Sequence, residues 1–156
     1  MRATVDQLQC MNAALQEAIK ALDEGEVPVG AIVEKDGRII GRGYNRVERL
    51  HDATAHAEVV AIGAASSLLS TWRLAGCTLY VTLEPCIMCL GAIMQSRVDA
   101  VVYGASDPRL GAIDTFLYCH ELERAYRYFP QITRGVMKEE CGQLLASFFR
   151  NVRNKS

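Results

Sequence analysis

Apolar residues recur at intervals of three and four along the first part of the chain. They are Val5, Leu8, Met11, Leu15, Ile19 and Leu22. Positions at these intervals share one face of an α-helix, and Gly25 follows where such a helix would end. The pattern therefore predicts an amphipathic helix over Thr4–Glu24 whose apolar face packs on a core.

Two runs rich in apolar and β-branched residues come next, at Val29–Glu34 and Arg38–Tyr44. Between them lies Lys35-Asp36-Gly37, and an Asp-Gly pair between two strand-like runs is a strong hairpin signal. We therefore expect an antiparallel pair of strands here, followed by a polar loop over residues 45–52.

Helix-like and strand-like segments alternate along the rest of the chain. Thr54 is expected to cap a helix that runs to about Ser67. Leu79–Leu83 suits a buried strand, and Pro85 suits the first position of the next helix, where its missing N–H costs nothing. The later elements are a strand over Ala100–Tyr103, a loop over Gly104–Asp114, a short helix near Phe116–Cys119, a weak strand from Ile132 and a closing helix with an apolar stripe at Cys141, Leu144, Leu145, Phe148 and Val152. This alternation is typical of βαβ units and predicts an α/β fold, a three-layer α/β/α sandwich.

The composition favours a single domain over residues 1–156. Its 50% hydrophobic content suffices to bury a core that needs no disulfide or metal cross-link. Six cysteines in a chain of this length, with no apolar leader at its start, indicate a reducing, cytoplasmic compartment. No apolar run approaches the roughly 18 residues of a membrane span, so we expect no membrane partner. The net charge of -1 argues against general coating of nucleic acid but permits local basic patches.

Cys86 and Cys89 introduce the candidate chemistry. Residues three apart share a helix face, so both thiols point the same way from a first helical turn, whose positive end favours thiolates. On spacing alone they could be a redox pair, half of a zinc site or two core thiols. The segment Thr54–Ala61 adds His56 and Glu58, and a His-x-Glu followed by Pro-Cys-x-x-Cys matches the signature of zinc-dependent deaminases. The sequence therefore predicts a catalytic zinc site.

The predicted zinc ligands are His56, Cys86 and Cys89. They leave the fourth position of one zinc ion for water or hydroxide, because the metal lowers the pKa of bound water to about 7. Glu58 would act as general acid and base while hydroxide attacks a ring carbon that bears an amine. Since positions two apart do not share a face in mid-helix, we expect His56 and Glu58 in a first turn.

Five segments give the sequence a specific resemblance to a known family, and together they span nearly the whole chain. They are EVPVGAIV at Glu26–Val33, GYNR within Gly41–Arg46, HDATAHAE at His51–Glu58, LYVTLEPCIMCLGAI at Leu79–Ile93 and SFFR at Ser147–Arg150. The chain resembles the cytidine and deoxycytidylate deaminase superfamily and, within it, the bacterial tRNA-specific adenosine deaminases.

The resemblance implies a fold, a reaction and roles for residues. The fold is a five-stranded mixed sheet between helices, in a homodimer whose partner helps to form the RNA site. The reaction converts the wobble adenosine to inosine in the anticodon stem-loop of an arginine tRNA, with the same zinc ligands and the same glutamate as proton shuttle. Asn45 resembles the residue that contacts the target base, and Asp107 falls where the family's substrate loop has its aspartate. Phe149, Arg150 and Arg153, in and beyond the SFFR segment, are expected to contact RNA.

Two other functions remain open at this point. A deaminase of free bases or nucleosides, of the guanine or cytosine type, would share the metal chemistry and differ only around the base. A structural zinc module for protein interaction would need a fourth protein ligand, such as Cys77, and would leave Glu58 idle. The chain also departs from the common family pattern at Tyr44, Ala53 and Ile113-Asp114-Thr115, away from the zinc ligands.

Several of these residues also have an ordinary structural interpretation. Asn45 could turn the backbone at a strand end, and Asp107 before a proline is a common turn residue. The cysteines outside the site are predicted to be small buried hydrophobes: Cys10, Cys77, Cys119 and Cys141. Two basic clusters could be solvated or could hold phosphates: Arg38, Arg42, Arg46 and Arg49, and then Arg150, Arg153 and Lys155.

Overall fold

The computed structural model describes residues 3–117 and 120–155, in which helices and strands alternate. In chain order the elements are α1 (Val5–Asp23), β1 (Gly30–Lys35), β2 (Arg38–Tyr44), α2 (Val47–Leu50), α3 (Ala57–Leu69), β3 (Cys77–Leu83), α4 (Ile87–Ser96), β4 (Ala100–Ala105), α5 (His120–Ala125), β5 (Gln131–Arg134) and α6 (Lys138–Lys155). The strands form one sheet in the order β2-β1-β3-β4-β5. β1 is antiparallel to β2 and β3, whereas β3, β4 and β5 are parallel, so the five-stranded sheet is mixed as expected.

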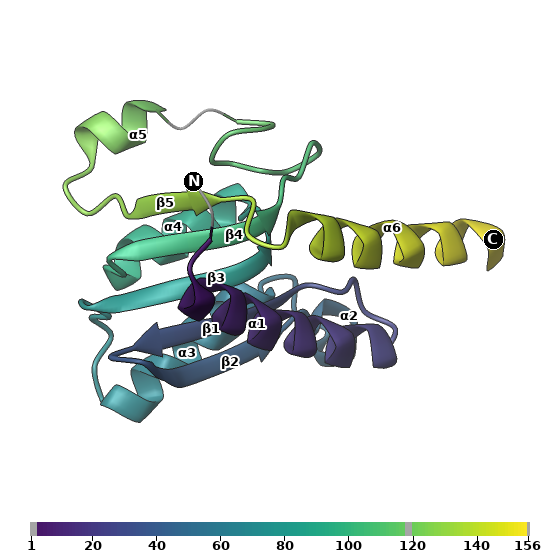
Figure 1. Cartoon of the computed structure of the whole chain (residues 1–156), viewed down its shortest axis with the longest axis horizontal. Coiled ribbons are helices and arrows are strands. Elements are labelled where there is room, and N and C mark those ends of the chain that lie inside the picture. The colour runs from purple at the N-terminus through teal and green to yellow at the C-terminus, as the bar shows by residue number, and fades with distance from the viewer. Residues whose placement is uncertain (1–2, 118–119, 156) are drawn as a thin grey trace.

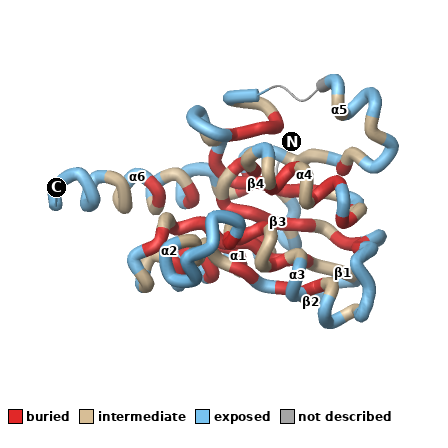
Figure 2. The backbone as a smooth tube through the Cα atoms, turned by 180° about the vertical axis from the view of Figure 1, so that it is seen from behind, coloured by how far each residue is buried: buried red, intermediate tan, exposed pale blue. Residues whose placement is uncertain are grey.

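Helices cover both faces of this sheet. α1 lies across one face, and α3 and α4 cover the other, as the front and back views show (Figures 1 and 2). Alternate residues of the central strand β3 serve the two layers, because side chains alternate across a strand. Leu79 and Val81 join the core with α3 and α4, while Tyr80 joins the core with α1. The predicted three-layer sandwich is confirmed.

The first helix and the hairpin form largely as their sequences predict. α1 begins with a capping box, in which Thr4 and Gln7 each accept a hydrogen bond from the other's backbone N–H. The hairpin turns at Asp36 and Gly37, whose φ angles of 51° and 80° lie in the left-handed region that an Asp-Gly pair tolerates. A Cβ at Gly41 of β2 would lie 2.5 Å from a backbone oxygen of α3, so glycine there lets the helix pack directly on the strand.

Two helices begin two residues later than predicted. Thr54 does not cap α3, because its N–H and its hydroxyl both donate to the Asp52 carboxylate, at 2.8 and 2.7 Å, and His56 takes the cap position instead. Pro85 precedes α4 rather than opening it, because Cys86 is the residue at the cap. Both shifts place a predicted zinc ligand at a helix N-terminus.

The segment after β4 also differs from prediction. The strand continues to Ala105, so the loop begins after it rather than at Gly104. No helix forms at Phe116 and Leu117, because both N–H groups donate to the Gly111 carbonyl and close a turn, at 3.0 and 2.9 Å. The rest of that predicted helix, including Cys119, lies outside the described residues. Of the other cysteines, Cys77 and Cys141 are buried as predicted, whereas Cys10 is only half-buried.

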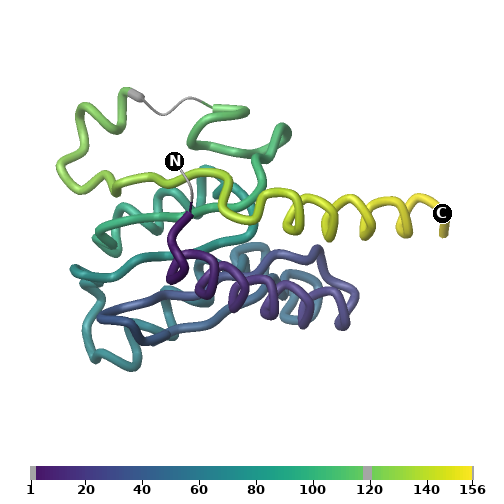
Figure 3. The backbone as a smooth tube through the Cα atoms, viewed as in Figure 1, coloured from purple at the N-terminus to yellow at the C-terminus, as the bar shows by residue number. Residues whose placement is uncertain are grey.

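The closing helix α6 leaves the body of the molecule. It starts beside β4, where Cys141 and Leu145 are buried, and its C-terminal half extends beyond the sheet (Figures 1 and 3). Val152, predicted as part of the core stripe, is 47% exposed for this reason. Neither α6 nor any other helix within the described residues is both long enough and apolar enough to cross a membrane.

Candidate functional site

Two helix N-termini meet beyond the end of β3. His56 occupies the cap position of α3 and Cys86 that of α4, and both have extended backbone angles without a side-chain hydrogen bond to the helix. Cys89 follows in the first turn of α4 and is fully buried. The positive ends of both helix dipoles therefore point at one place, where they favour thiolate over thiol.

Three predicted metal ligands converge there. The Nδ1 atom of His56 lies 3.6 Å from the sulfur of Cys86 and 3.5 Å from that of Cys89, and all three donor atoms lie within 4.8 Å of one another. Zinc–nitrogen bonds of about 2.0–2.1 Å and zinc–sulfur bonds of about 2.3 Å at tetrahedral angles place such donors about 3.6 Å apart. The donor set and its spacing therefore fit a zinc ion.

The three ligands change one another's pKa values. A hydrogen bond from Cys89, helped by one from His56, lowers the pKa of the Cys86 thiol to about 4. The hydrogen bond with Cys86, together with burial, raises the pKa of Cys89. The hydrogen bond to Cys86 raises the pKa of His56. Cys86 is thus poised as a thiolate, which is the form that binds metal.

Glu58 lies beside these ligands in the first turn of α3, as predicted. Its side chain is only 4% exposed, and this burial raises the pKa of its carboxyl. Glu58 also lines a pocket, together with His56 and Cys86. A carboxyl group whose pKa is raised is better suited to taking up and releasing a proton than an ordinary carboxylate.

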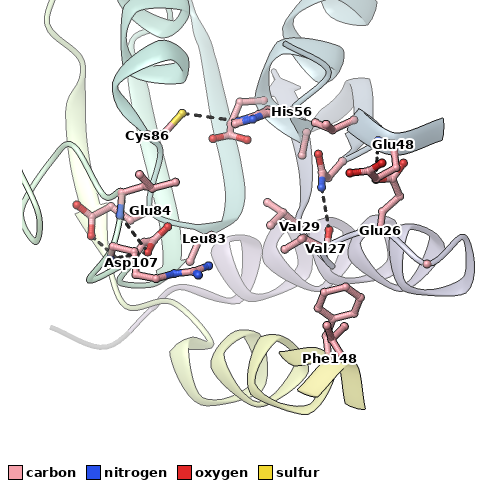
Figure 4. A pocket seen from close by; sticks show the side chains of 18 residues that line it. Glu26, Val27, Val29, Glu48, His56, Leu83, Glu84, Cys86, Asp107 and Phe148 are labelled. Carbon is pink, nitrogen blue, oxygen red and sulfur yellow. Dashed lines mark hydrogen bonds between the residues drawn. The ribbon is translucent and has the colours of Figure 1, made fainter. Parts of the chain in front are cut away.

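This pocket has a volume of about 430 Å³ and extends from His56 and Cys86 to the side of α6. Figure 4 shows His56 and Cys86 at one end, with Leu83 and Val29 along the side and Phe148 from α6 at the other end. Such a cavity, mostly apolar with a few polar groups, is the usual form of a ligand site.

Asn45 lines this pocket. Its backbone N–H donates to the Val29 carbonyl at 3.0 Å, and its side-chain amide donates to the Val27 carbonyl at 3.4 Å. Its Oδ1 atom is buried without a hydrogen-bond partner among the described residues. Because an unpaired buried acceptor is costly, this oxygen is available to a donor on a ligand.

The loop over residues 106–115 forms another side of the pocket. Asp107 lines it, but one oxygen of its carboxylate accepts hydrogen bonds from the N–H groups of Arg109 and Leu110, at 2.9 and 3.3 Å. Arg109 and Leu110 also line the pocket, and the Arg109 guanidinium lies 4.9 Å from the centre of the Phe149 ring. Sequence reasoning missed Arg109 and Leu110, although both lie within the loop that it placed near the substrate.

The predicted residues of α6 divide between two faces of the helix. Phe148 and Val152 line the pocket, whereas Phe149 packs against the core and is not among the lining residues. Arg150 and Arg153 are exposed and also lie outside the pocket lining. The apolar stripe of α6 contained the signal for Phe148 and Val152, since they are four residues apart on one helix face.

The alternative fourth ligand, Cys77, lies far from the donors. It begins β3, whose other end leads to the site, and seven strand residues at about 3.3 Å each separate the two ends by roughly 20 Å. Its thiol is directed to the Ala75 carbonyl. The described arrangement therefore holds a three-residue donor set with an open side, which is the form of a catalytic zinc site.

Comparison with known proteins gives four findings. The family model of the cytidine and deoxycytidylate deaminase zinc-binding region matches residues 4–105. The tRNA-specific adenosine deaminase of Bacillus subtilis (strain 168) is 47% identical over 152 residues, which are 97% of this chain and 93% of that protein. A structure solved in studies of A-to-I editing by tRNA:A34 deaminases at the wobble position has a TM-score of 0.83 and 40% identity, and covers 88% of this chain and 99% of that one. The guanine deaminase of Bacillus subtilis is less similar, with a TM-score of 0.60 and 36% identity over 77% of this chain and 70% of that one.

Proposed function

This chain belongs to the cytidine and deoxycytidylate deaminase family, and we propose that it hydrolyses adenosine to inosine at the wobble position of a tRNA anticodon. The site itself supports this proposal. A zinc donor set and a buried carboxyl group lie at one end of a pocket, and α6, which extends beyond the sheet, forms the wall at the other end. The similarity to tRNA-specific adenosine deaminases over nearly the full chain supports the choice of substrate.

The residues of the site would have two roles, metal binding and proton transfer. His56, Cys86 and Cys89 would hold one zinc ion. When bound, zinc supplies Lewis acidity that makes water nucleophilic near neutral pH, in the fourth position that the three ligands leave open. Glu58 would take one proton of this water and deliver it to a ring nitrogen of the base, and would then pass the water's second proton from the new hydroxyl group to the departing amine. Water is consumed, and ammonia and inosine are the products.

The base would enter between apolar and polar walls. Val29 and Leu83 line the pocket on the way to the donors, and the free Oδ1 of Asn45 can accept a hydrogen bond from the base or its ribose. An anticodon loop suits such a pocket, because its bases are already exposed and unstacking costs less than in a duplex.

The outer end of the pocket favours a nucleotide within RNA over a free base. α6 continues as an exposed helix to Lys155 instead of folding over the site (Figure 1). Arg109 at the rim offers a guanidinium to a phosphate, and Phe148 offers a ring on which a neighbouring base can stack. A free-base enzyme would have no use for these outer groups.

We also propose that residues 1–156 form a single zinc-dependent deaminase domain that acts as a homodimer in the cytoplasm, where its tRNA substrate would be found. The outer surface of α3 and α4 could pack against the same surface of a second copy of the chain, because it combines small and apolar residues. Leu68 and Ile87 are 66% and 54% exposed there, and a Cβ at Gly63 or Gly91 would meet nothing within 4 Å.

The deciding experiment is incubation of the zinc-loaded protein with a transcribed arginine tRNA that carries A34, followed by detection of inosine. Guanine, cytosine and free adenosine are offered in parallel, and the Glu58→Gln variant is the control. Inosine at position 34 with no comparable turnover of the free compounds supports the proposal. Turnover of a free base without change in the tRNA would replace it with the free-base alternative.

A further inference from the structure

Glu84 connects the zinc-binding segment to the loop beside it. It lies between β3 and Cys86, and its side chain is only 2% exposed. Its Oε2 atom accepts hydrogen bonds from the N–H groups of Ile113, Asp114 and Thr115, at 3.0, 2.8 and 3.2 Å. A buried carboxylate is costly unless such donors surround it, so the loop conformation and the carboxylate depend on each other.

The other oxygen of Glu84 reaches the start of the same loop. Oε1 accepts from the N–H of Asp107 at 3.2 Å and from the Thr115 hydroxyl. A Cβ on Gly111 would lie 2.5 Å from the Glu84 carboxyl carbon, so the loop can wrap this closely only with glycine at that position. The Ala112 N–H also donates to the Pro85 carbonyl at 2.8 Å. The loop is thus bonded at both ends to the two residues before Cys86.

The contact with Asp107 leads to the rim of the pocket. The Glu84 carboxylate accepts a hydrogen bond from the Asp107 N–H. The Asp107 carboxylate in turn accepts hydrogen bonds from the N–H groups of Arg109 and Leu110. Arg109 then lies against the Phe149 ring. In Figure 4, Glu84 and Asp107 lie next to each other, on the same side of the pocket as Cys86. A series of hydrogen bonds therefore runs from the residue near the zinc ligand to the residues that would meet RNA.

We propose that Glu84 is a positioning residue for the substrate: through Asp107 it fixes Arg109 and Leu110 against the RNA strand whose adenine enters the zinc site. This inference rests on the proposed function, and it assigns to Glu84 an effect on RNA binding rather than on chemistry or metal binding. Among the described residues, no hydrogen bond joins Glu84 to the donor atoms of His56, Cys86 or Cys89.

Glu84→Gln tests this role with little change in volume. All five partners donate to the carboxylate, and a glutamine has only one acceptor oxygen. Its oxygen would stay with the three N–H groups, and its amide nitrogen would face the Thr115 hydroxyl, which can turn and accept. The Asp107 N–H alone would then face another donor and lose its partner. The variant should therefore fold while it releases the start of the loop.

The matched control is Glu17→Gln. Glu17 is also 2% exposed, but it pairs with Lys20 and Arg42 at 2.9 and 3.6 Å and does not line the pocket. Both changes are combined with Glu58→Gln, and binding of an anticodon stem-loop RNA is measured by fluorescence anisotropy. In the background with Glu58 intact, KM, kcat and zinc content are measured, together with hydrogen exchange at the Asp107 amide.

We expect Glu84→Gln to raise the RNA Kd and KM roughly tenfold, the factor that loss of one hydrogen bond to a charged group represents. kcat and zinc content should stay within about twofold of the control, and exchange should accelerate at Asp107 but not at Ile113. RNA affinity equal to that of the Glu17→Gln control, or a loss confined to kcat or zinc, would overturn the proposal. If the wild-type chain binds the RNA but leaves its adenosine unchanged, the proposed function fails while the binding arm still decides the role of Glu84.

A second pair of variants covers the case in which Glu84→Gln does not fold. Gly111→Ala would push the loop away from Glu84, whereas Gly142→Ala adds a methyl group that meets nothing within 4 Å. RNA affinity should fall for the first variant and not for the second, with zinc content unchanged in both. Equal affinities for the two variants would contradict the positioning role.

Discussion

The two ends of the pocket are built in different ways. The metal wall consists of His56, Glu58, Cys86 and Cys89 at the starts of α3 and α4. The outer wall consists of Asp107, Arg109, Leu110, Phe148 and Val152, from a loop and from a helix that leaves the sheet. Residues of the metal wall are held by helix starts packed on a sheet, so their geometry follows from the fold. Those of the outer wall depend on a few hydrogen bonds and on the direction of one helix.

Under the proposed function, the metal wall carries out the chemistry and the outer wall selects the substrate. The guanine deaminase of Bacillus subtilis and the tRNA:A34 deaminase structure both share the family fold with this chain. Variants on the two walls should therefore separate zinc content and kcat from RNA affinity.

The largest effect is expected from loss of a ligand in the metal wall. Cys86→Ser removes a thiolate that serine cannot replace, so bound zinc and deamination should fall to background together, with some loss of thermal stability. Zinc is measured by elemental analysis and turnover by inosine formation. Cys10→Ser, a half-buried cysteine on α1 far from the site, is the control and should keep both. A Cys86→Ser protein that retains one zinc and full turnover would show that the donor set is assigned wrongly.

A smaller effect on a different observable is expected at Glu58. Glu58→Gln keeps the shape of the side chain and all three ligands but removes the group that carries the proton. Turnover should fall by roughly 10² to 10⁴, the range typical of general acid–base catalysis, while zinc content and RNA affinity stay at wild-type values. Single-turnover kinetics with excess enzyme separates this loss from product release. Substantial deamination by the variant would require another proton carrier.

The contrast also explains which parts of the site could be predicted. Cys86 and Cys89 are three residues apart, and His56 and Glu58 are two apart, so local geometry and a known signature suffice to group them. Thr54 shows the limit of this reasoning. Its hydroxyl donates to Asp52 instead of capping the helix, and α3 begins two residues later than the sequence predicts. A sequence contains several possible caps, and tertiary packing selects among them.

The outer wall could not be predicted in the same way. The periodic stripe placed Phe148 and Val152 on one face with the core residues, but it does not reveal where α6 passes the end of the sheet. Phe149 was expected to meet RNA because it belongs to a shared segment, yet its ring packs inward. The hydrogen-bond partners of Glu84 are residues 107 and 113–115, more than twenty positions along the chain. Hydrogen bonds over such a separation leave no periodic pattern in the sequence.

Phe148 and Phe149 offer a direct test of this difference between neighbours. Phe148→Ala should weaken binding of the anticodon stem-loop, because stacking of a base on an aromatic ring contributes about 1–3 kcal/mol. Phe149→Ala should mainly lower thermal stability, by less than the roughly 3–5 kcal/mol of a fully buried phenylalanine. RNA affinity is measured by anisotropy and stability by chemical denaturation. The reverse assignment of the two effects would mean that α6 presents its other face to the substrate.

The smallest effect is expected from the basic end of α6, which continues the outer wall away from the pocket. Arg150, Arg153 and Lys155 are exposed there, and phosphates neutralised by such groups release counterions, which makes affinity depend on salt. Replacing all three with alanine should weaken RNA binding modestly and flatten the dependence of log affinity on log salt by roughly 0.7 for each lost contact with single-stranded RNA. Zinc content should not change. The control replaces Arg73 and Arg127, which are exposed and follow the C-terminal ends of α3 and α5, and its slope should equal that of the wild type. If the triple variant keeps the wild-type slope, the end of α6 is only a solvated helix terminus, and phosphates must be held by Arg109 or by the arginines around β2.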